Sequence, residues 1–170
     1  KDIRQIEEKD IDGVYAICHL AGLSNDPVGE LNPELTYDIN YRASVRLAKI
    51  AKSSGVKRFV FSSSCSMYGI AGGESALDEN SAFNPITAYA KSKVFTEKEI
   101  TPLADNNFCV TFLRNATAYG VSPKLRLDLV VNNLVGWAVT SKQIRIMSDG
   151  TPWRPVIHCE DIARAFIAVI

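Results

Sequence analysis

A tyrosine and a lysine four residues apart are the side chains of this sequence that are best suited to proton transfer. Tyr89 and Lys93 lie in the stretch NPITAYAKSKVFTEKEI (residues 84–100), where an Asn-Pro turn precedes a predicted helix. This spacing is about one helical turn, so both side chains project from the same face. An ammonium group beside a phenol favours the phenolate and lowers the pKa of the tyrosine. Tyr89 is therefore a candidate general acid/base for the interconversion of an alcohol and a ketone.

Polar side chains at the ends of neighbouring elements could complete such a site. The serine run that ends with Ser64 closes a predicted strand at residues 58–65, where α/β proteins place their ligands. Asn40 falls on the buried face of a predicted helix at 32–55, and a buried amide must find hydrogen-bond partners. Both features also have structural interpretations, since serine runs form turns and a buried asparagine can simply hold the fold together. The Tyr–Lys spacing also occurs in surface pairs, so these residues alone leave the function open.

Strand-like and helix-like segments alternate along the chain. Apolar runs bounded by turn residues predict strands, and apolar residues at helical spacing predict helices. This alternation requires crossover connections and predicts an α/β protein with a mainly parallel sheet. Strands that run into loops are predicted at 14–22 and 108–120, a strand at 58–65, and an extended segment at 144–148. The other predicted segments are helices at 32–55, 84–100 and 127–139, a glycine-rich loop at 70–85, and a short strand followed by a helix in VIHCEDIARAFIAVI (156–170).

Two of the predicted helices have recognisable ends. In the helix at 32–55, Asn32 is a good N-cap, Pro33 suits the first helical position, and Gly55 suits the C-cap. Pro102 is expected to kink or end the helix that carries Tyr89, because it has no backbone N–H to donate. The core-facing side of the helix at 32–55 is predicted from Leu35, Ile39, Ala43, Leu47 and Ile50.

Composition and charge exclude several function classes. The 170 residues suffice for one ordinary domain with a hydrophobic core. Nineteen basic residues balance nineteen acidic ones, so neither nucleic acid nor an anionic membrane is expected as a partner. No apolar run approaches the roughly 20 residues that span a bilayer. These features predict a cytoplasmic protein.

The cysteines and histidines offer little for a metal site. The four cysteines lie far apart and form no CxxC pair, and only two histidines are present. We therefore expect buried, reduced thiols and no metal ion. The cysteines are Cys18, Cys65, Cys109 and Cys159.

Along essentially the whole chain, ordered segments resemble the extended short-chain dehydrogenase/reductase family, whose nucleotide-sugar epimerases and dehydratases are its best-known members. The central match joins SSSCSMYG (62–69) through a loop to NPITAYAKSK (84–93). The others are DIRQ (2–5), HLAG (19–22), LRNATAYG (113–120) and DGTPWRPVIHCEDIARA (149–165). The resemblance implies a Rossmann-like doubly wound parallel sheet that is incomplete at its N-terminus. It also implies a partial NAD(P)-binding domain with the catalytic residues in 1–140, and the start of a substrate-domain segment with a returning helix in 141–170.

The resemblance assigns roles to individual residues. It makes Tyr89 the catalytic acid/base, and it makes Lys93 the group that lowers the pKa of Tyr89 and holds the nicotinamide ribose. Ser64 matches the third catalytic residue, with Ser63 and Ser66 close in register. The other implied positions are Asp2 and Ile3 beside the adenine, Leu20, Ala21 and Gly22 in a loop beside the cofactor, and Asn40, Ser64, Thr117 and Arg154 for the substrate, with Arg154 on its diphosphate.

The sequence also departs from the family pattern. The GxxGxxG fingerprint, whose glycines let the backbone approach the cofactor pyrophosphate, is not in this sequence, so we expect a piece of a larger protein. Cys65 and Ser66 stand where sugar 4,6-dehydratases carry an acidic pair, which argues against dehydration. Thr117 replaces an asparagine of the UDP-galactose 4-epimerase pattern, which leaves the sugar open.

The leading functional hypothesis is an NAD-dependent sugar-nucleotide epimerase, or a related oxidoreductase, that acts through a transient keto sugar. NADP is the alternative cofactor, because the strand that would distinguish the two is not in the sequence. Two other interpretations stay open: a reductase with net consumption of NAD(P)H, and a non-catalytic or truncated homologue that serves binding or assembly. Helices like 34–53 and 86–101 pair two subunits in members of this family, so a homodimer is possible.

Overall fold

The computed structural model describes residues 1–24, 26–70, 76–151 and 153–170. They form two compact units, Lys1–Arg114 with Val169–Ile170, and Asn115–Ala168. The functional division expected between residues 140 and 141 is a different boundary and stays a prediction. Residues 71–75 of the predicted glycine-rich loop lie outside the described residues.

The first unit is built on a three-stranded sheet. Its strands are β1 (Ala16–His19), β2 (Arg58–Ser64) and β3 (Cys109–Asn115), in the order β1-β2-β3. β1 and β2 are parallel, with Ala16 opposite Arg58 and His19 opposite Phe61. The strands predicted within 14–22, 58–65 and 108–120 are therefore confirmed. Because β1 and β2 are parallel, the loops after His19 and Ser64 leave the same edge of the sheet.

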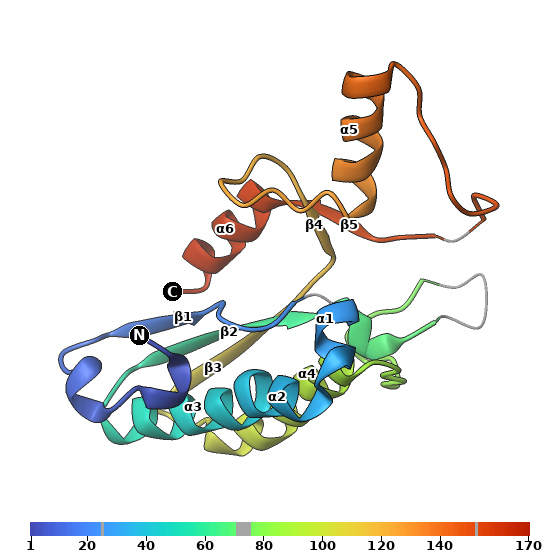
Figure 1. Cartoon of the computed structure of the whole chain (residues 1–170). Coiled ribbons are helices and arrows are strands. Elements are labelled where there is room, and N and C mark those ends of the chain that lie inside the picture. Colours follow the sequence, from blue (N-terminus) through green and yellow to red (C-terminus); the bar gives the residue numbers. More distant parts are fainter. Residues whose placement is uncertain (25, 71–75, 152) are drawn as a thin grey trace. The chain divides into compact units, whose positions relative to one another are not determined.

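Helices cover one face of this sheet (Figure 1). They are α2 (Pro33–Tyr37), α3 (Ala43–Ser53) and α4 (Ala88–Ile100). The core between them and the sheet includes Leu47, Ala48, Phe59, Phe61 and Ile100. Each large apolar side chain that is fully buried contributes roughly 1.5–3 kcal/mol, so this layer fixes the elements that carry the predicted site. The shorter helices of the unit are η1 (Ile3–Gln5), η2 (Glu8–Asp10), α1 (Asp26–Leu31), η3 (Asp38–Arg42), η4 (Cys65–Tyr68) and η5 (Thr101–Leu103).

The helix predicted at 32–55 consists of α2, a π-helical turn (η3) and α3. Asn32 is its N-cap, as predicted, and its side-chain oxygen accepts from the Leu35 N–H at 3.0 Å. Gly55 follows α3 with a φ of +78°, the left-handed conformation expected at a helix end. The predicted stripe is wrong at Leu35, which is 39% exposed, while α2 buries Thr36 instead. The wide π turn changes the phase of the faces, so a single helical period does not run through all three segments.

The helix that carries Tyr89 begins later than the Asn-Pro turn. Thr87 is its N-cap, because the Thr87 hydroxyl accepts from the Ala90 N–H at 3.1 Å. α4 ends at Ile100, and Pro102 lies in the 3₁₀ turn that follows, as predicted.

The second unit contains a small parallel pair, β4 (Thr117–Tyr119) and β5 (Val156–His158), with α5 (Val130–Ser141) and α6 (Cys159–Ala168). The short strand and helix predicted in 156–170 are confirmed. The prediction of extended structure at 144–148 is wrong, because this segment forms no strand. Ile144, Ile146 and Met147 are all more than half exposed, and their apolar spacing was the signal that misled.

The cysteines are free thiols, but the prediction that they are buried is wrong. Cys18 and Cys109 are exposed, and Cys65 and Cys159 are half-buried. On β1 the side chains alternate, so His19 faces the helices and Cys18 faces the opposite side of the sheet. No helix within the described ranges is long and apolar enough to cross a membrane.

Candidate functional site

Lys93 is buried at the junction of α4 and the end of β2. Its Nζ donates to the Ser62 carbonyl oxygen at 2.7 Å and lies 4.5 Å from the centroid of the Phe61 ring. The same Nζ lies 5.4 Å from the centroid of the Tyr89 ring, one turn earlier on α4. The two side chains therefore share a face of the helix, and this face is turned toward the end of β2.

Burial tunes the charge of Lys93. The side chain is 6% exposed, and loss of hydration lowers the pKa of its amine to about 8, against an opposing effect of the Glu97 carboxylate. Near neutral pH the amine still carries its proton. A cation held beside the Tyr89 ring with few competing waters favours the phenolate more strongly than a surface lysine would.

Ser64 and its neighbours divide into two groups. The Ser64 Oγ caps η4, where it accepts from the Ser66 N–H at 3.2 Å and from the Ser66 hydroxyl at 2.9 Å. Ser63 points elsewhere: its hydroxyl donates to a Glu97 carboxylate oxygen at 2.5 Å, and the residue is 2% exposed. The structure thus brings Ser66 together with Ser64, whereas the Ser63 hydroxyl is bonded to Glu97 of α4.

Asn40 connects the loop after β1 to α4. Its side-chain oxygen accepts from the Leu23 N–H at 2.7 Å, and its side-chain nitrogen donates to the Leu23 carbonyl at 2.8 Å. The Asn40 backbone carbonyl lies in the π turn and accepts from the hydroxyls of Ser44 at 2.8 Å and Thr96 at 3.1 Å. Asn40 therefore fixes the segment after Leu20, Ala21 and Gly22. Its expected role in substrate binding stays a prediction.

Gly22 approaches Asn40 so closely that a side chain would not fit easily. A Cβ at Gly22 would lie 3.0 Å from the Asn40 side-chain oxygen. Leu20, Ala21 and Gly22 are themselves exposed. Asn40 thus anchors the loop after β1, while the backbone of Leu20, Ala21 and Gly22 stays exposed and open to a ligand.

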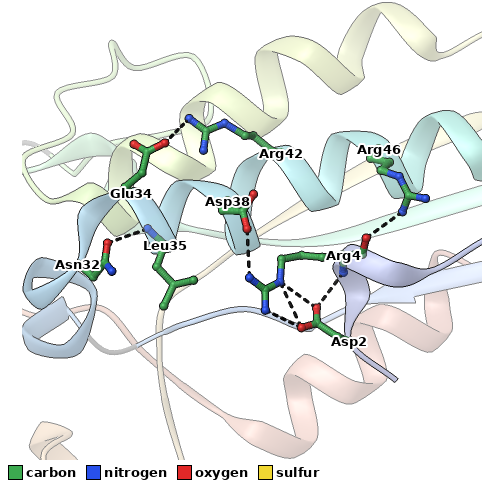
Figure 2. A network of polar contacts seen from close by, with 8 residues as sticks. All are labelled: Asp2, Arg4, Asn32, Glu34, Leu35, Asp38, Arg42 and Arg46. Atoms are coloured by element: carbon green, nitrogen blue, oxygen red, sulfur yellow. Dashed lines mark hydrogen bonds and ion pairs between the residues drawn. The ribbon is translucent and has the colours of Figure 1, made fainter.

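Asp2 and Ile3 lie at the start of the chain, where Asp2 caps η1 and Ile3 begins it. Figure 2 shows Asp2 and Arg4 of this segment beside Asp38 and Arg46 of the helices. The Asp2 carboxylate accepts from the Arg4 N–H at 2.9 Å and pairs with the Arg4 guanidinium at 2.7 Å. Arg4 also pairs with Asp38 of η3 at 3.2 Å, and Arg46 of α3 donates to the Arg4 carbonyl at 3.2 Å. These contacts fix the position of Ile3, and the adenine-binding role of the segment stays a prediction.

Thr117 and Arg154 lie in the second unit. Thr117 begins β4, and its N–H donates to the Pro155 carbonyl at 3.1 Å. Arg154 is exposed, two residues before β5. Their predicted contacts with a sugar nucleotide stay predictions.

Sequence reasoning did not identify His19, Glu97 or Arg114. His19 is 3% exposed, and its Nε2 lies 2.7 Å from the Ser44 hydroxyl, which in turn donates to the Asn40 carbonyl. Burial and the nearby charge of Lys93 lower the pKa of His19 to about 4, so the ring is neutral near pH 7. Its position directly before the Leu20 loop could have indicated a role. For Glu97, the available signal was its place one turn after Lys93.

Comparisons with known proteins identify the family. The chain is 30% identical over 157 residues to a UDP-glucuronate 4-epimerase of Thermodesulfobacterium geofontis, a match that covers 91% of this chain and 47% of the relative. The fold is similar to that of a UDP-N-acetylglucosamine 4-epimerase from Methanobrevibacter ruminantium M1, with a TM-score of 0.87, 25% identity, and coverage of 99% and 56% of the two chains. It is also similar to MoeE5, whose structure contains UDP-glucose and NAD, with a TM-score of 0.84, 25% identity, and coverage of 99% and 56%.

These matches confirm the resemblance to the extended short-chain dehydrogenase/reductases and the Rossmann-like α/β fold. The chain spans about half the length of the curated relatives that it matches. A model of the NAD-dependent epimerase/dehydratase family matches residues 2–170. The chain therefore belongs to the NAD-dependent epimerase/dehydratase family.

Proposed function

We propose that this chain carries the catalytic residues of an NAD-dependent epimerase that acts on a nucleotide sugar through a transient keto sugar. The observation that carries this proposal is the buried Lys93 amine, which lies 5.4 Å from the centroid of the Tyr89 ring and is bonded to the end of β2. A mere surface pair would leave the lysine in water, where its effect on a phenol is small. The relatives and solved neighbours that act on UDP-sugars support the choice of substrate class.

The residues at the edge of the sheet fit a nicotinamide cofactor. Leu20, Ala21 and Gly22 offer exposed backbone after β1, and the missing Cβ of Gly22 leaves room for the Asn40 side chain that holds this loop. Lys93 would hold the ribose, and Asp2 and Ile3 would lie beside the adenine. The cofactor, when bound, supplies the acceptor and donor of hydride.

The side chains of this chain would move the proton. The Tyr89 oxygen takes the proton of a sugar hydroxyl as that carbon is oxidised, and the same oxygen returns it when the keto group is reduced, so Tyr89 is unchanged over the cycle. The Ser64 hydroxyl orients the reacting oxygen, and the Lys93 ammonium stabilises the phenolate. Asn40 holds the loop beside the cofactor, and Arg154 would bind the diphosphate.

The first experiment is a fluorescence titration of this chain with NADH, in the wild type and in Lys93→Met. We expect saturable binding that is weaker in the variant, because the ribose contact is lost. Absence of binding at millimolar NADH would contradict the proposal that this chain binds the cofactor. The matched control is Tyr15→Phe, which changes an exposed tyrosine before β1 and should leave binding unchanged.

Turnover of UDP-sugars by the full-length protein tests the chemistry. Tyr89→Phe should lower kcat by about 100-fold or more, because it removes the acid/base, and Tyr15→Phe should not. Normal turnover in Tyr89→Phe would contradict the mechanism. Steady consumption of NADH would favour the reductase, and binding without turnover would favour the non-catalytic homologue. The homodimer and the cytoplasmic location stay predictions.

A further inference from the structure

α4 is attached to the end of β2 at two points, one helical turn apart. Lys93 donates to the Ser62 carbonyl at 2.7 Å, and Glu97 accepts from the Ser63 hydroxyl at 2.5 Å. Both charged residues are buried, at 6% and 4% exposure. Two neighbouring residues of the strand therefore fix the helix that carries Tyr89 in two respects: its position along the strand and its rotation about its own axis.

Arg114 of β3 holds the Glu97 carboxylate from the other side. Its Nε lies 3.2 Å from each carboxylate oxygen, and its Nη2 lies 2.8 Å from one of them. Its Nη1 donates to the Tyr68 hydroxyl at 2.7 Å and to the Glu79 carbonyl at 2.8 Å. The guanidinium also lies 4.9 Å from the centroid of the Phe83 ring. Arg114 thus joins α4 to the turn and the loop that follow β2.

These contacts hold the chain in place on both sides of Ser64. Ser63, directly before it, is bonded to Glu97, and Tyr68, at the end of η4, is bonded to Arg114. A buried ion pair is a poor source of stability, because its desolvation cost is close to its attraction and apolar residues often serve as well. Its hydrogen bonds are directional, however, and they can fix neighbouring groups in one arrangement.

We propose that Glu97 is a positioning residue of the predicted site. Together with Ser63, Tyr68 and Arg114, it keeps Lys93 in contact with the Ser62 carbonyl. The same contacts fix Ser63 and Tyr68, the residues on either side of Ser64 that are held in place. The catalytic consequence rests on the proposed function, whereas the structural part does not. In an active protein, loss of the Glu97 charge should lower kcat by about 10- to 100-fold and change KM by less than about threefold.

The electrostatics of α4 agree with this geometry. The charged and titratable groups that face Lys93 are Tyr89 and Glu97 of α4 and His19 of β1, and Arg114 of β3 acts on it through Glu97. Burial lowers the pKa of Lys93, and the Glu97 carboxylate is the group that raises it. Removing that carboxylate should leave the Lys93 amine easier to deprotonate.

The test is an NMR titration of Lys93 in protein that carries ¹³C-labelled lysine, with Lys93→Arg used to assign the signal. In Glu97→Gln the pKa of Lys93 should fall below its wild-type value, and Glu97→Asp, which keeps the charge, should bring it back toward that value. The matched control is Glu99→Gln, which removes the same charge from an exposed position on the same helix. An unchanged Lys93 pKa in Glu97→Gln would overturn the proposal.

A milder variant covers the case in which Glu97→Gln does not fold. Ser63→Ala removes one hydroxyl and no charge, and it should speed amide hydrogen exchange over residues 62–68 more than over 59–61. Equal acceleration over both stretches would indicate a merely structural role and would overturn the proposal. Both measurements need neither NAD nor a sugar nucleotide, so their failure is separate from failure of the proposed function in the NADH titration.

Discussion

Two polar clusters of the first unit differ in their surroundings. The Ser63–Glu97–Arg114 cluster lies inside, where the side chains of Glu97 and Arg114 are 5% and 20% exposed. The Asp2–Arg4–Asp38 cluster of Figure 2 lies at the surface, with side-chain exposures of 37%, 40% and 42%. Both contain an arginine that binds more than one partner. Only the first is shielded from water and salt.

The difference shows why similar contacts have different consequences. Water screens the surface pairs, so breaking one returns two hydrated ions at little cost. Inside, the partner left behind remains buried, and its charge is uncompensated. The inner cluster should therefore control stability and position, and the outer cluster should only hold a surface segment in place.

Removal of the inner arginine should give the largest effect. We expect Arg114→Ala to lower the free energy of unfolding by about 2–4 kcal/mol, because Glu97 loses its partner while it stays buried. The lower part of this range applies if water reaches the site through the exposed part of Arg114. The measurement is urea unfolding followed by circular dichroism.

The matched comparison is Arg4→Ala, which removes the same side chain from the outer cluster. It should shift the urea midpoint much less than Arg114→Ala does. Equal shifts would show that burial does not separate the two clusters, and the contrast between them would fail.

A second prediction concerns pH, because the inner region also contains the buried His19. Its pKa is lowered to about 4, from an ordinary value of 6.5, so the unfolded chain binds a proton more readily than the folded one. The stabilisation is present above pH 6.5 and is lost as the pH falls through 4. It amounts to about 3 kcal/mol.

His19→Gln isolates this effect, because glutamine can donate to Ser44 but does not titrate. Urea unfolding between pH 6.5 and 4 should show a smaller loss of stability in the variant than in the wild type. Parallel losses in the two proteins would show that His19 does not set the acid sensitivity of the inner region.

Much of the fold could be predicted from the sequence, because the apolar patterns of β2 and α3 are local and strong. Failures arose where the tertiary structure overrides a local pattern. The π turn at Asp38–Arg42 changes the phase between α2 and α3, so Leu35 faces water. At 144–148 the apolar spacing was real, but no strand pairs with this segment.

Only some residues around the end of β2 could be predicted from the sequence. Tyr89, Lys93 and Ser64 could be named as candidates because their spacing matches a known pattern, and their catalytic roles stay predictions. Glu97 and Arg114 could not be joined, since 17 residues separate them and a salt bridge between distant elements leaves no periodic signal. His19 could not be joined to its partner either, since Ser44 lies 25 residues away in the sequence.

A third prediction concerns the start of α4. Thr87→Ala removes the side-chain oxygen that accepts from the Ala90 N–H, and should lower the free energy of unfolding by about 1 kcal/mol. This loss should be smaller than that of Arg114→Ala, because water can replace a cap. Thr87→Ser keeps the hydroxyl and should restore most of the stability in the same urea measurement. A loss as large in the serine variant would assign the effect to the threonine methyl group.

The smallest effect is expected for the salt dependence of the outer cluster. The Arg4 guanidinium holds the pKa of Asp2 at about 2, below its ordinary value of 3.8. The stability that this contact contributes is therefore fully present above pH 3.8 and is lost as the pH falls through about 2. At neutral pH, the difference in urea midpoint between wild type and Arg4→Gln should be small in dilute buffer and should vanish in 1 M NaCl, where the Debye length is about 3 Å. The difference between wild type and Arg114→Ala should persist in the same salt, because the Glu97 carboxylate is shielded from solvent ions. If high salt abolished both differences, the inner ion pair would be as accessible as the outer one, and its proposed hold on Lys93 would lose its physical basis.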